Sequence, residues 1–215
     1  ESEGFQVVDK NLPYERALFE AKIGRIDAVI PAFKDEAPNF IFPSFAVSLT
    51  EYCFYVLVDE PRRYNGLGSL RNMRFVATSG YSYGKEMDAY ISTNEGGRVT
   101  LIGGDDVSSR LRELVKLKRF ESLLDDRLLF DSSRNSVGLV SAVCRTERHA
   151  GYLALSPNDP DRSNAIAQTF ERGFMNIRES GKLCEILKNY GLGIEFMPDL
   201  NGEPCQAGKS NPGRF

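Results

Sequence analysis

A helix-to-strand unit occurs twice in the 215-residue sequence, and this internal repeat constrains the fold more than any other feature. In the first copy, a helical pattern passes through Gly24-Arg25 into the strand pattern Ile26–Ile30, which reads apolar, acidic, small, apolar, apolar. In the second, a helical pattern passes through Lys118-Arg119 into Phe120–Leu124. Both copies read as helix, basic turn and strand. Short αβ units can resemble one another by chance, but two copies are also typical of two similar α/β lobes.

The chain as a whole alternates helical and strand patterns with short connections, which predicts an α/β fold with mainly parallel sheets. We expect helices over Leu12–Gly24, Lys85–Ile91, Val107–Leu117, Asn135–Cys144, Asp161–Ser180 and Lys182–Tyr190. We expect strands over Ile26–Pro31, Tyr52–Val58, Arg74–Thr78, Val99–Ile102, Phe120–Leu124 and Tyr152–Leu155. From Pro198 onward the chain is rich in Gly, Pro and Asn, which is typical of a loose tail.

Charge and hydropathy exclude several classes of partner. The formal net charge is −3, whereas a nucleic-acid or acidic-membrane surface needs a clustered positive field. No apolar stretch approaches the roughly 18 residues that span a bilayer. Residues Glu1–Phe5 do not read as a signal peptide, so an exported protein would already have lost its signal.

The four cysteines are compatible with two redox states. No pair has CxxC spacing, and the single His149 leaves no zinc-type cluster, so we expect neither a metal nor another cofactor. Free thiols in a cytosolic protein and one or two disulfides in an exported one both remain open. If bridges form, Cys184 on the last helix and Cys205 in the tail are the predicted pair, because that bridge would hold the tail.

One segment has the features of a ligand site. Ser79–Gly84 joins a predicted strand to the start of a predicted helix. Free backbone N–H groups and the helix dipole at such a start attract an anionic or strongly polar group. Other motifs fail: the segment Gly202–Ser210 resembles a phosphate-binding loop, but its spacing is one residue too long and no strand precedes it.

Taken in order, the segments Gly24–Ala28, Pro43–Val58, Gly80–Gly84 and Arg119–Asp126 resemble the type 2 periplasmic binding-protein superfamily. The most similar branch is the family 3 extracellular solute-binding proteins, which serve ABC importers. The resemblance covers about Val7 to Phe196. It implies two lobes, each with a mixed, mainly parallel sheet flanked by helices, joined by two crossover strands.

The resemblance also implies where the lobes and the ligand would lie. Residues 1–58 and 151–215 would form lobe I, with the crossover strand at the end of the first part, and 59–150 would form lobe II. Asp126 matches the family's acidic residue that pairs with a ligand amino group, with Asp125 as its rival. The remaining implied ligand contacts are the loop residues Tyr81, Ser82 and Tyr83, and on the facing lobe Phe33 and Lys34.

Two departures from the family pattern affect these expectations. The family's first strand, aromatic loop and helix do not precede Leu12, so we expect an additional N-terminal segment, a strand swapped from a second copy, or a folded-back tail in their place. The family's carboxylate-binding Arg is also missing, since no Arg lies between Arg25 and Arg62. The resemblance therefore implies a small polar ligand, amino-acid-like or of another kind, that binds without the family's usual arginine grip on a carboxylate.

The resemblance thus predicts a periplasmic solute-binding protein for an ABC permease, with no enzymatic activity. Two alternatives use the same scaffold: a ligand-sensing domain for a signalling partner, and a dehydratase-like enzyme. A third is a scaffold that binds a protein partner instead of a solute. An acid or base with a strongly perturbed pKa in the ligand site would favour the enzyme.

Overall fold

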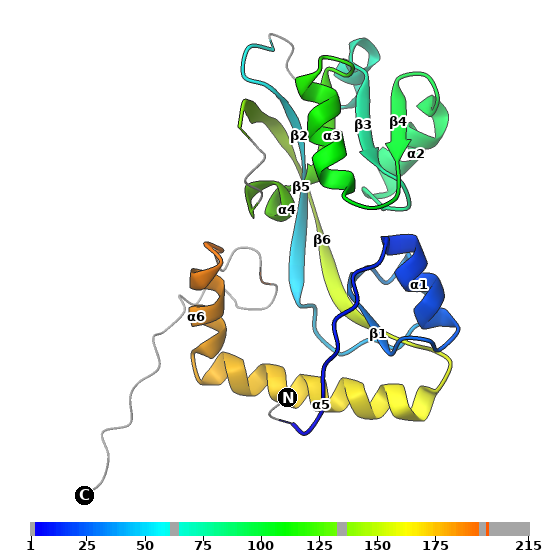
Figure 1. Cartoon of the computed structure of the whole chain (residues 1–215), viewed down its shortest axis with the longest axis vertical. Helices are drawn as coiled ribbons and strands as arrows, with labels where there is room; N and C mark the ends of the chain where they lie inside the picture. Colours follow the sequence, from blue (N-terminus) through cyan, green and yellow to red (C-terminus); the bar gives the residue numbers. More distant parts are fainter. Residues whose placement is uncertain (1–2, 61–64, 133–136, 194–196, 198–215) are drawn as a thin grey trace, which may run out of the picture. The chain divides into compact units, whose positions relative to one another are not determined.

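The computed structural model describes residues 3–60, 65–132, 137–193 and 197. Six strands follow the hydrogen-bonded order β1-β6-β2-β5-β3-β4, and helices flank them (Figure 1). The strands are β1 (Ala28–Ala32), β2 (Ser48–Leu57), β3 (Phe75–Thr78), β4 (Val99–Ile102), β5 (Ser122–Asp126) and β6 (Leu139–Leu155). The helices are α1 (Tyr14–Lys22), α2 (Lys85–Asn94), α3 (Val107–Lys116), α4 (Arg127–Ser132), α5 (Pro160–Glu179), α6 (Lys182–Asn189) and the 3-10 helix η1 (Leu67–Asn72). The predicted α/β class is confirmed.

The sheet is mixed. β3 pairs in parallel with β4 and with β5, while β2 pairs antiparallel with β5 and β1 antiparallel with β6. The strands thus form a single hydrogen-bonded sheet, whereas the sequence predicted two sheets. The two sets of strands are joined because the long strands β2 and β6 are neighbours. Parallel pairing is confined to the three strands β5, β3 and β4 among those described.

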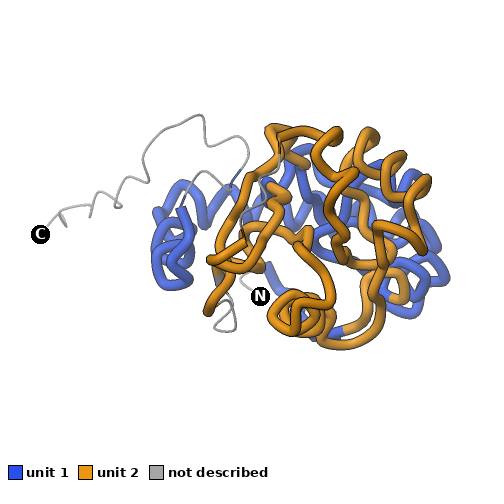
Figure 2. Tube along the Cα trace, turned by 90° about the horizontal axis from the view of Figure 1, so that it is seen from above, with its two compact units in different colours: residues 1–11, 17–49, 150–215 blue, residues 12–16, 50–149 orange. Residues whose placement is uncertain are grey.

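The chain divides into two compact units, shown in different colours in Figure 2. Unit 1 comprises Glu1–Asn11, Ala17–Leu49 and Ala150–Phe215, and unit 2 comprises Leu12–Arg16 and Thr50–His149. Both long strands change unit along their length: β2 after Leu49 and β6 after His149. In unit 2, β2 pairs with β5 from Tyr52 to Val56.

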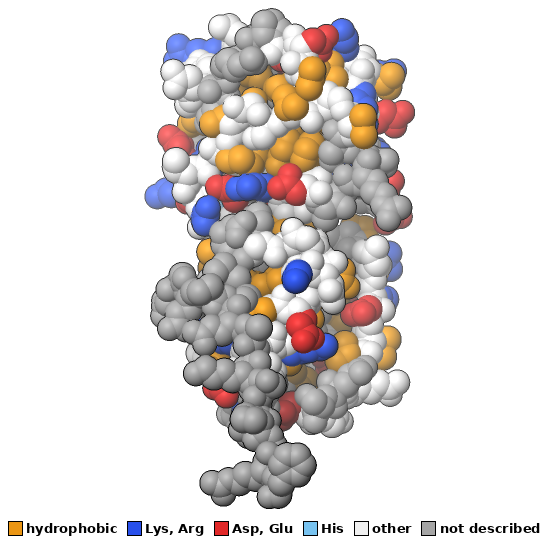
Figure 3. All heavy atoms as spheres, turned by 90° about the vertical axis from the view of Figure 1, so that its left-hand side faces the viewer, with side chains coloured by type: hydrophobic (Ala, Val, Ile, Leu, Met, Phe, Trp, Pro, Cys, Tyr) orange, Lys and Arg blue, Asp and Glu red, His pale blue; other side chains and the backbone are white. Residues whose placement is uncertain are grey.

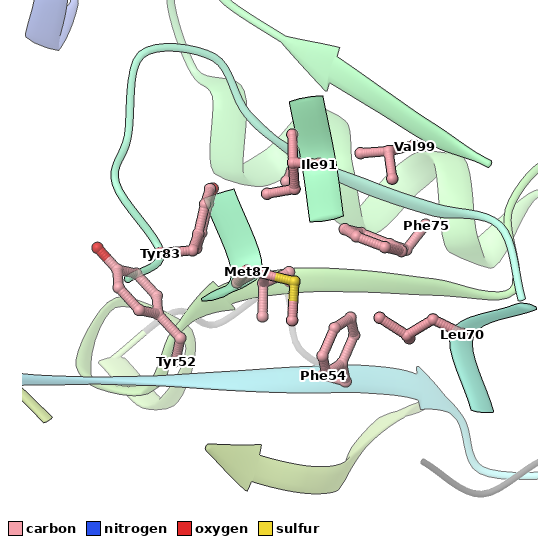
Figure 4. Packing of buried hydrophobic residues seen from close by; sticks show 10 residues of the cluster. Tyr52, Phe54, Leu70, Phe75, Tyr83, Met87, Ile91 and Val99 are labelled. Carbon is pink, nitrogen blue, oxygen red and sulfur yellow. The ribbon is translucent and has the colours of Figure 1, made fainter. Parts of the chain in front are cut away.

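The core of unit 2 lies on both faces of its strands. Alternate residues of β2 face opposite sides, as the strand pleat requires. Tyr52 and Phe54 join α2 residues in one cluster, whose packing is shown in Figure 4. Cys53 and Tyr55 join α3 residues and Phe130 of α4 in the other. The three helices therefore sandwich the sheet, as alternating βα segments with apolar helix stripes favour.

Unit 1 is built around the ends of β1 and β6. Ala28 pairs with Leu155 and Val29 with Ala154, and Leu155 also exchanges backbone hydrogen bonds with Ile41. The helix α5 covers these strands with Ala167. Its start is set locally, because the Asp159 carboxylate accepts the backbone N–H of Arg162 and Pro160 occupies the first turn.

One predicted helix is wrong. The span Asn135–Cys144 was expected to be helical, but residues 139–144 form the first part of β6, and Asn135 lies outside the described residues. The local apolar spacing of Leu139, Val140 and Val143 fits a helix. Pairing beside β2 and the disulfide from Cys144 to Cys53 favour the strand instead, a case of tertiary contacts overriding local pattern.

Candidate functional site

The segment Ser79–Gly84 does connect β3 to α2, as predicted. Ser79 continues the β-ladder by donating its N–H to the carbonyl of Ile102, at 2.9 Å. Gly80 and Gly84 have φ of +78° and +88°, conformations that favour glycine, and they turn the chain sharply into the helix. The loop thus lies at the carboxyl edge of the parallel strands, where ligands of open α/β sheets bind.

The loop's polar groups are largely engaged by a carboxylate of the same helix. Asp88 accepts the Ser82 hydroxyl at 2.7 Å and the backbone N–H of Tyr83 at 2.7 Å. These are two of the donors that the sequence assigned to a ligand. Asp88 therefore holds the loop in shape, and a solute at this position would meet a preformed, internally bonded turn.

The two tyrosines that the sequence assigned to the ligand, Tyr81 and Tyr83, differ in burial. Tyr83 is buried in the core, where its hydroxyl accepts the N–H of Thr78 at 2.7 Å and its ring lies 4.7 Å from that of Tyr52 (Figure 4). Burial raises the pKa of Tyr83. Tyr81 is half-buried and meets the ring of Tyr14 edge-on, at 5.3 Å. Of the two tyrosines, Tyr81 is the one that presents surface to solvent.

Asp126 closes β5, two residues beyond Leu124, where the sequence predicted that the strand would end. It is buried rather than in a solvated turn, and its carboxylate accepts the backbone N–H of Leu129 at 3.0 Å, which caps α4. Burial raises the pKa of Asp126, while hydrogen bonds from Leu129, Thr50 and Leu128 oppose the rise. The cap accounts for a carboxylate at this position whether or not a ligand binds it.

Asp125, its rival in the sequence, forms a buried ion pair. The Nη2 atom of Arg112 lies 3.3 Å from its Oδ2, and both side chains are almost fully buried. Arg112 also donates to the carbonyl of Leu129 and lies over the ring of Phe130. Burial raises the pKa of Asp125 to about 7, against the lowering effect of Arg112 and of the Asp126 N–H. This pair joins α3 to β5 inside the core.

In unit 1, Phe33 and Lys34 directly follow β1. Phe33 is half-buried and Lys34 is exposed. The Lys34 ammonium lies 4.3 Å from the ring of Tyr152 and 5.8 Å from that of Phe42, within the range of cation–π attraction. The two rings meet edge-on at 5.8 Å. The aromatic partners of Lys34 were not singled out in the sequence, since they lie far from it along the chain.

A cluster of charged side chains from β2, α4 and β6 of unit 2 was also missed. Glu51 binds Arg127 at 2.8 Å and lies 3.7 Å from Arg148, and Arg127 further pairs with Asp131. On the face shown in Figure 3, positive and negative side chains lie next to one another, without a continuous field of one sign. No pattern along the sequence could indicate this cluster, because its partners come from three elements.

The cysteines resolve one of the open alternatives. Cys53 and Cys144, on neighbouring strands and 91 residues apart in sequence, form a disulfide. Cys184 is also disulfide-bonded, while its predicted partner Cys205 lies outside the described residues. Glu51 lies close to the first bridge, but with both sulfurs oxidised these atoms cannot serve as thiolate metal ligands.

Within the described residues, none of the helices combines the length and apolarity needed to cross a membrane.

Comparison with known proteins places the fold. No family model matches the sequence, and no curated protein matches it. Three of the solved structures that resemble this chain illustrate the similarity. The first is a mutant of ArgBP from T. maritima, with a TM-score of 0.67 and 13% sequence identity over 85% of this chain and 76% of that one. The second is an amino acid ABC transporter substrate-binding protein from Streptococcus pneumoniae bound to L-arginine, with a TM-score of 0.63 and 15% identity over 84% of this chain and 74% of that one. The third is a histidine kinase sensor domain with similarity to periplasmic binding proteins, with a TM-score of 0.65 and 15% identity over 82% of this chain and 75% of that one.

These similarities define the fold as that of the type 2 periplasmic binding proteins. They extend over most of each neighbour, at 13–15% sequence identity. The structural neighbours include solute-binding proteins and a sensor domain.

Proposed function

We propose that this chain is a periplasmic solute-binding protein of an ABC importer, which captures a small polar molecule and has no catalytic role of its own. The observation that carries the proposal is the Ser79–Gly84 turn, which presents the start of α2 at the carboxyl edge of β3 and β5 in a fold shared with solute-binding proteins. Tyr81, Ser82 and Asp126 of unit 2 are the proposed contacts there. Phe33 and Lys34 are the proposed contacts of unit 1.

Two further observations support this proposal. The Cys53–Cys144 bridge favours an oxidising compartment, since disulfides seldom persist in a reducing cytosol. Asp125, whose pKa is raised, is held in a buried ion pair with Arg112, so its perturbation is explained by the core and gives no support to an enzyme. Tyr83 is not among the proposed contacts with the solute, because its hydroxyl accepts the backbone N–H of Thr78 in the core.

A sensor role is the second candidate, because one structural neighbour is a histidine kinase sensor domain. Both roles require the same solute site, and they differ in the membrane partner. Co-purification with a permease, rather than with a kinase, separates them.

The proposed role of Asp126 is tested by two variants that separate charge from helix capping. Asn caps helices about as well as Asp, whereas Ala does not. We expect Asp126→Asn to retain the melting temperature but to lose about 1–3 kcal/mol of affinity for a cationic solute found by thermal-shift screening of amino acids, polyamines and small organic acids. Asp126→Ala should lose affinity and also about 1 kcal/mol of stability.

If the screen yields a stabilising cationic solute and Asp126→Asn binds it as tightly as the wild type, Asp126 acts only as the α4 cap and is not a contact. If no solute of any class stabilises the protein, the proposed function itself is contradicted, because a ligand at 100-fold over its Kd adds roughly 2.7 kcal/mol.

A further inference from the structure

Three charged or polar side chains of β6 face the start of α2. Arg145, Glu147 and His149 alternate along the strand and therefore point to the same side, the side on which Val143 packs against the α2 core cluster. The intervening Arg148 faces the other side, where it lies near Glu51. The strand thus places one basic, one acidic and one imidazole group beside the helix terminus.

Arg145 is a buried cation whose guanidinium is only partly hydrogen-bonded. Its side chain is only 7% exposed, and its Nε atom is buried without a hydrogen-bond partner among the described residues. Its Nη2 atom lies 3.3 Å from Glu147 and 3.8 Å from Glu86 in the first turn of α2. A cation buried next to the positive end of a helix dipole favours an anion at that place, because both fields attract negative charge.

Glu147 supplies that anion from within the protein. The carboxylate oxygen that Arg145 contacts lies 4.0 Å from Nε2 of His149. It also lies against Gly84, the N-cap of α2: a Cβ added to this glycine would lie 2.5 Å from it. The Glu147 side chain is 49% exposed, so it reaches the buried cation from the solvent side.

This geometry differs from that of an ordinary surface ion pair. The arginine is buried and fixed, while the acid is half-exposed and can turn into solvent without breaking the core. A tethered carboxylate competes with a free one through its high effective concentration. It therefore keeps small anions out of a position that would otherwise bind them.

We propose that Arg145, His149 and the start of α2 form a carboxylate-binding site that the protein fills with its own Glu147, so that Glu147 determines which solutes unit 2 accepts. This inference rests on the proposed function for its consequence: the natural solute presents a hydroxyl, an amide or a cationic group to this part of unit 2, and not a carboxylate. The site itself can be tested without the natural solute.

The test is an NMR titration of the folded protein with sodium acetate at constant ionic strength. We expect Glu147→Ala to bind acetate at least about tenfold more tightly than the wild type, since a hydrogen bond to a charged group contributes about 1.5–3 kcal/mol. The shifted resonances should include the backbone amides of Gly84 and Arg145. Adding Arg145→Met to Glu147→Ala should abolish the gain.

Glu86→Ala is the matched control, because it removes a neighbouring acid of the same charge that is 70% exposed and does not fill the site. The inference is overturned if Glu86→Ala gains acetate affinity as Glu147→Ala does, or if neither variant gains any. Glu147→Gln, which keeps the side-chain size, decides the matter if Glu147→Ala does not fold; a gain in acetate affinity supports the site and none contradicts it. Failure here leaves the solute screen unaffected, and failure of the screen leaves the acetate result unaffected.

Discussion

Replacing Cys53 and Cys144 by Ala is expected to lower the melting temperature by roughly 10–20 °C, the largest of the effects predicted for this protein. The bridge joins β2 to β6 over 91 residues of sequence. In the chain-entropy model, a loop of about 100 residues contributes about 4.7 kcal/mol by restricting the unfolded chain. Cys53 also lies in the core cluster of α3, so the loss of its sulfur adds a packing term.

The single variants distinguish the bridge from side-chain packing. Cys53→Ala and Cys144→Ala each break the disulfide, so each should cost nearly as much as the double variant, measured by denaturant unfolding under non-reducing conditions. Small, additive costs from the two single variants would show that the bridge contributes little to stability.

The second large effect is expected at Arg112. Substitution by Met removes the guanidinium that Asp125 faces in the core, and breaking one side of a buried ion pair costs about 3–5 kcal/mol. The double variant Arg112→Met/Asp125→Leu should be markedly more stable than Arg112→Met, because it leaves no buried charge. Chemical denaturation of the four proteins in the cycle measures the coupling, and independent costs at the two sites would contradict it.

The stability cost of Arg112→Met is expected to depend on pH. The pKa of Asp125 is raised in the folded protein, so its favourable contribution is present at acidic pH and is lost as the pH rises through about 7. Removing Arg112 removes a group that lowers this pKa, so the loss extends to higher pH. We therefore expect Arg112→Met to be less damaging at pH 5 than at pH 8. An equal cost at both pH values would mean that Asp125 does not titrate in this range.

The internal repeat in the sequence predicted more of the fold than any single motif. Both copies are helix–strand units, α1 with β1 and α3 with β5. They match in backbone detail as well. Gly24 and Lys118 occupy the same place after their helices, and both have positive φ, +76° and +56°. The basic turn therefore predicted the end of each helix correctly, because the residues at the C-terminus of a helix determine where it stops.

Features that depend on distant residues could not be predicted in this way. The first part of β6, residues 139–144, was mistaken for a helix, because its pairing with β2 cannot be read from the spacing of its own apolar residues. The alternation of Arg145, Glu147 and His149 is visible in the sequence, but it acquires meaning only once that segment is a strand beside α2. The Asp125–Arg112 pair was missed for the same reason, since 13 residues separate the partners.

The candidate site was predicted only in part. The strand-to-helix turn at Ser79–Gly84 was predicted from its position between a predicted strand and a predicted helix, and the structure places it at the carboxyl edge of β3. The engagement of Ser82 and Tyr83 by Asp88 was not predicted, although an acid in the first turn of a helix is a common signal for such a contact.

Native mass spectrometry of the folded protein, incubated with a mixture of amino acids, polyamines and small organic acids, tests the central claim most directly. The proposed function predicts one small-molecule adduct for each chain, selected from the mixture, retained by the folded protein and lost on unfolding. A folded protein that carries no adduct, or several unselected ones in proportion to their concentrations, would contradict solute binding as the function of this chain.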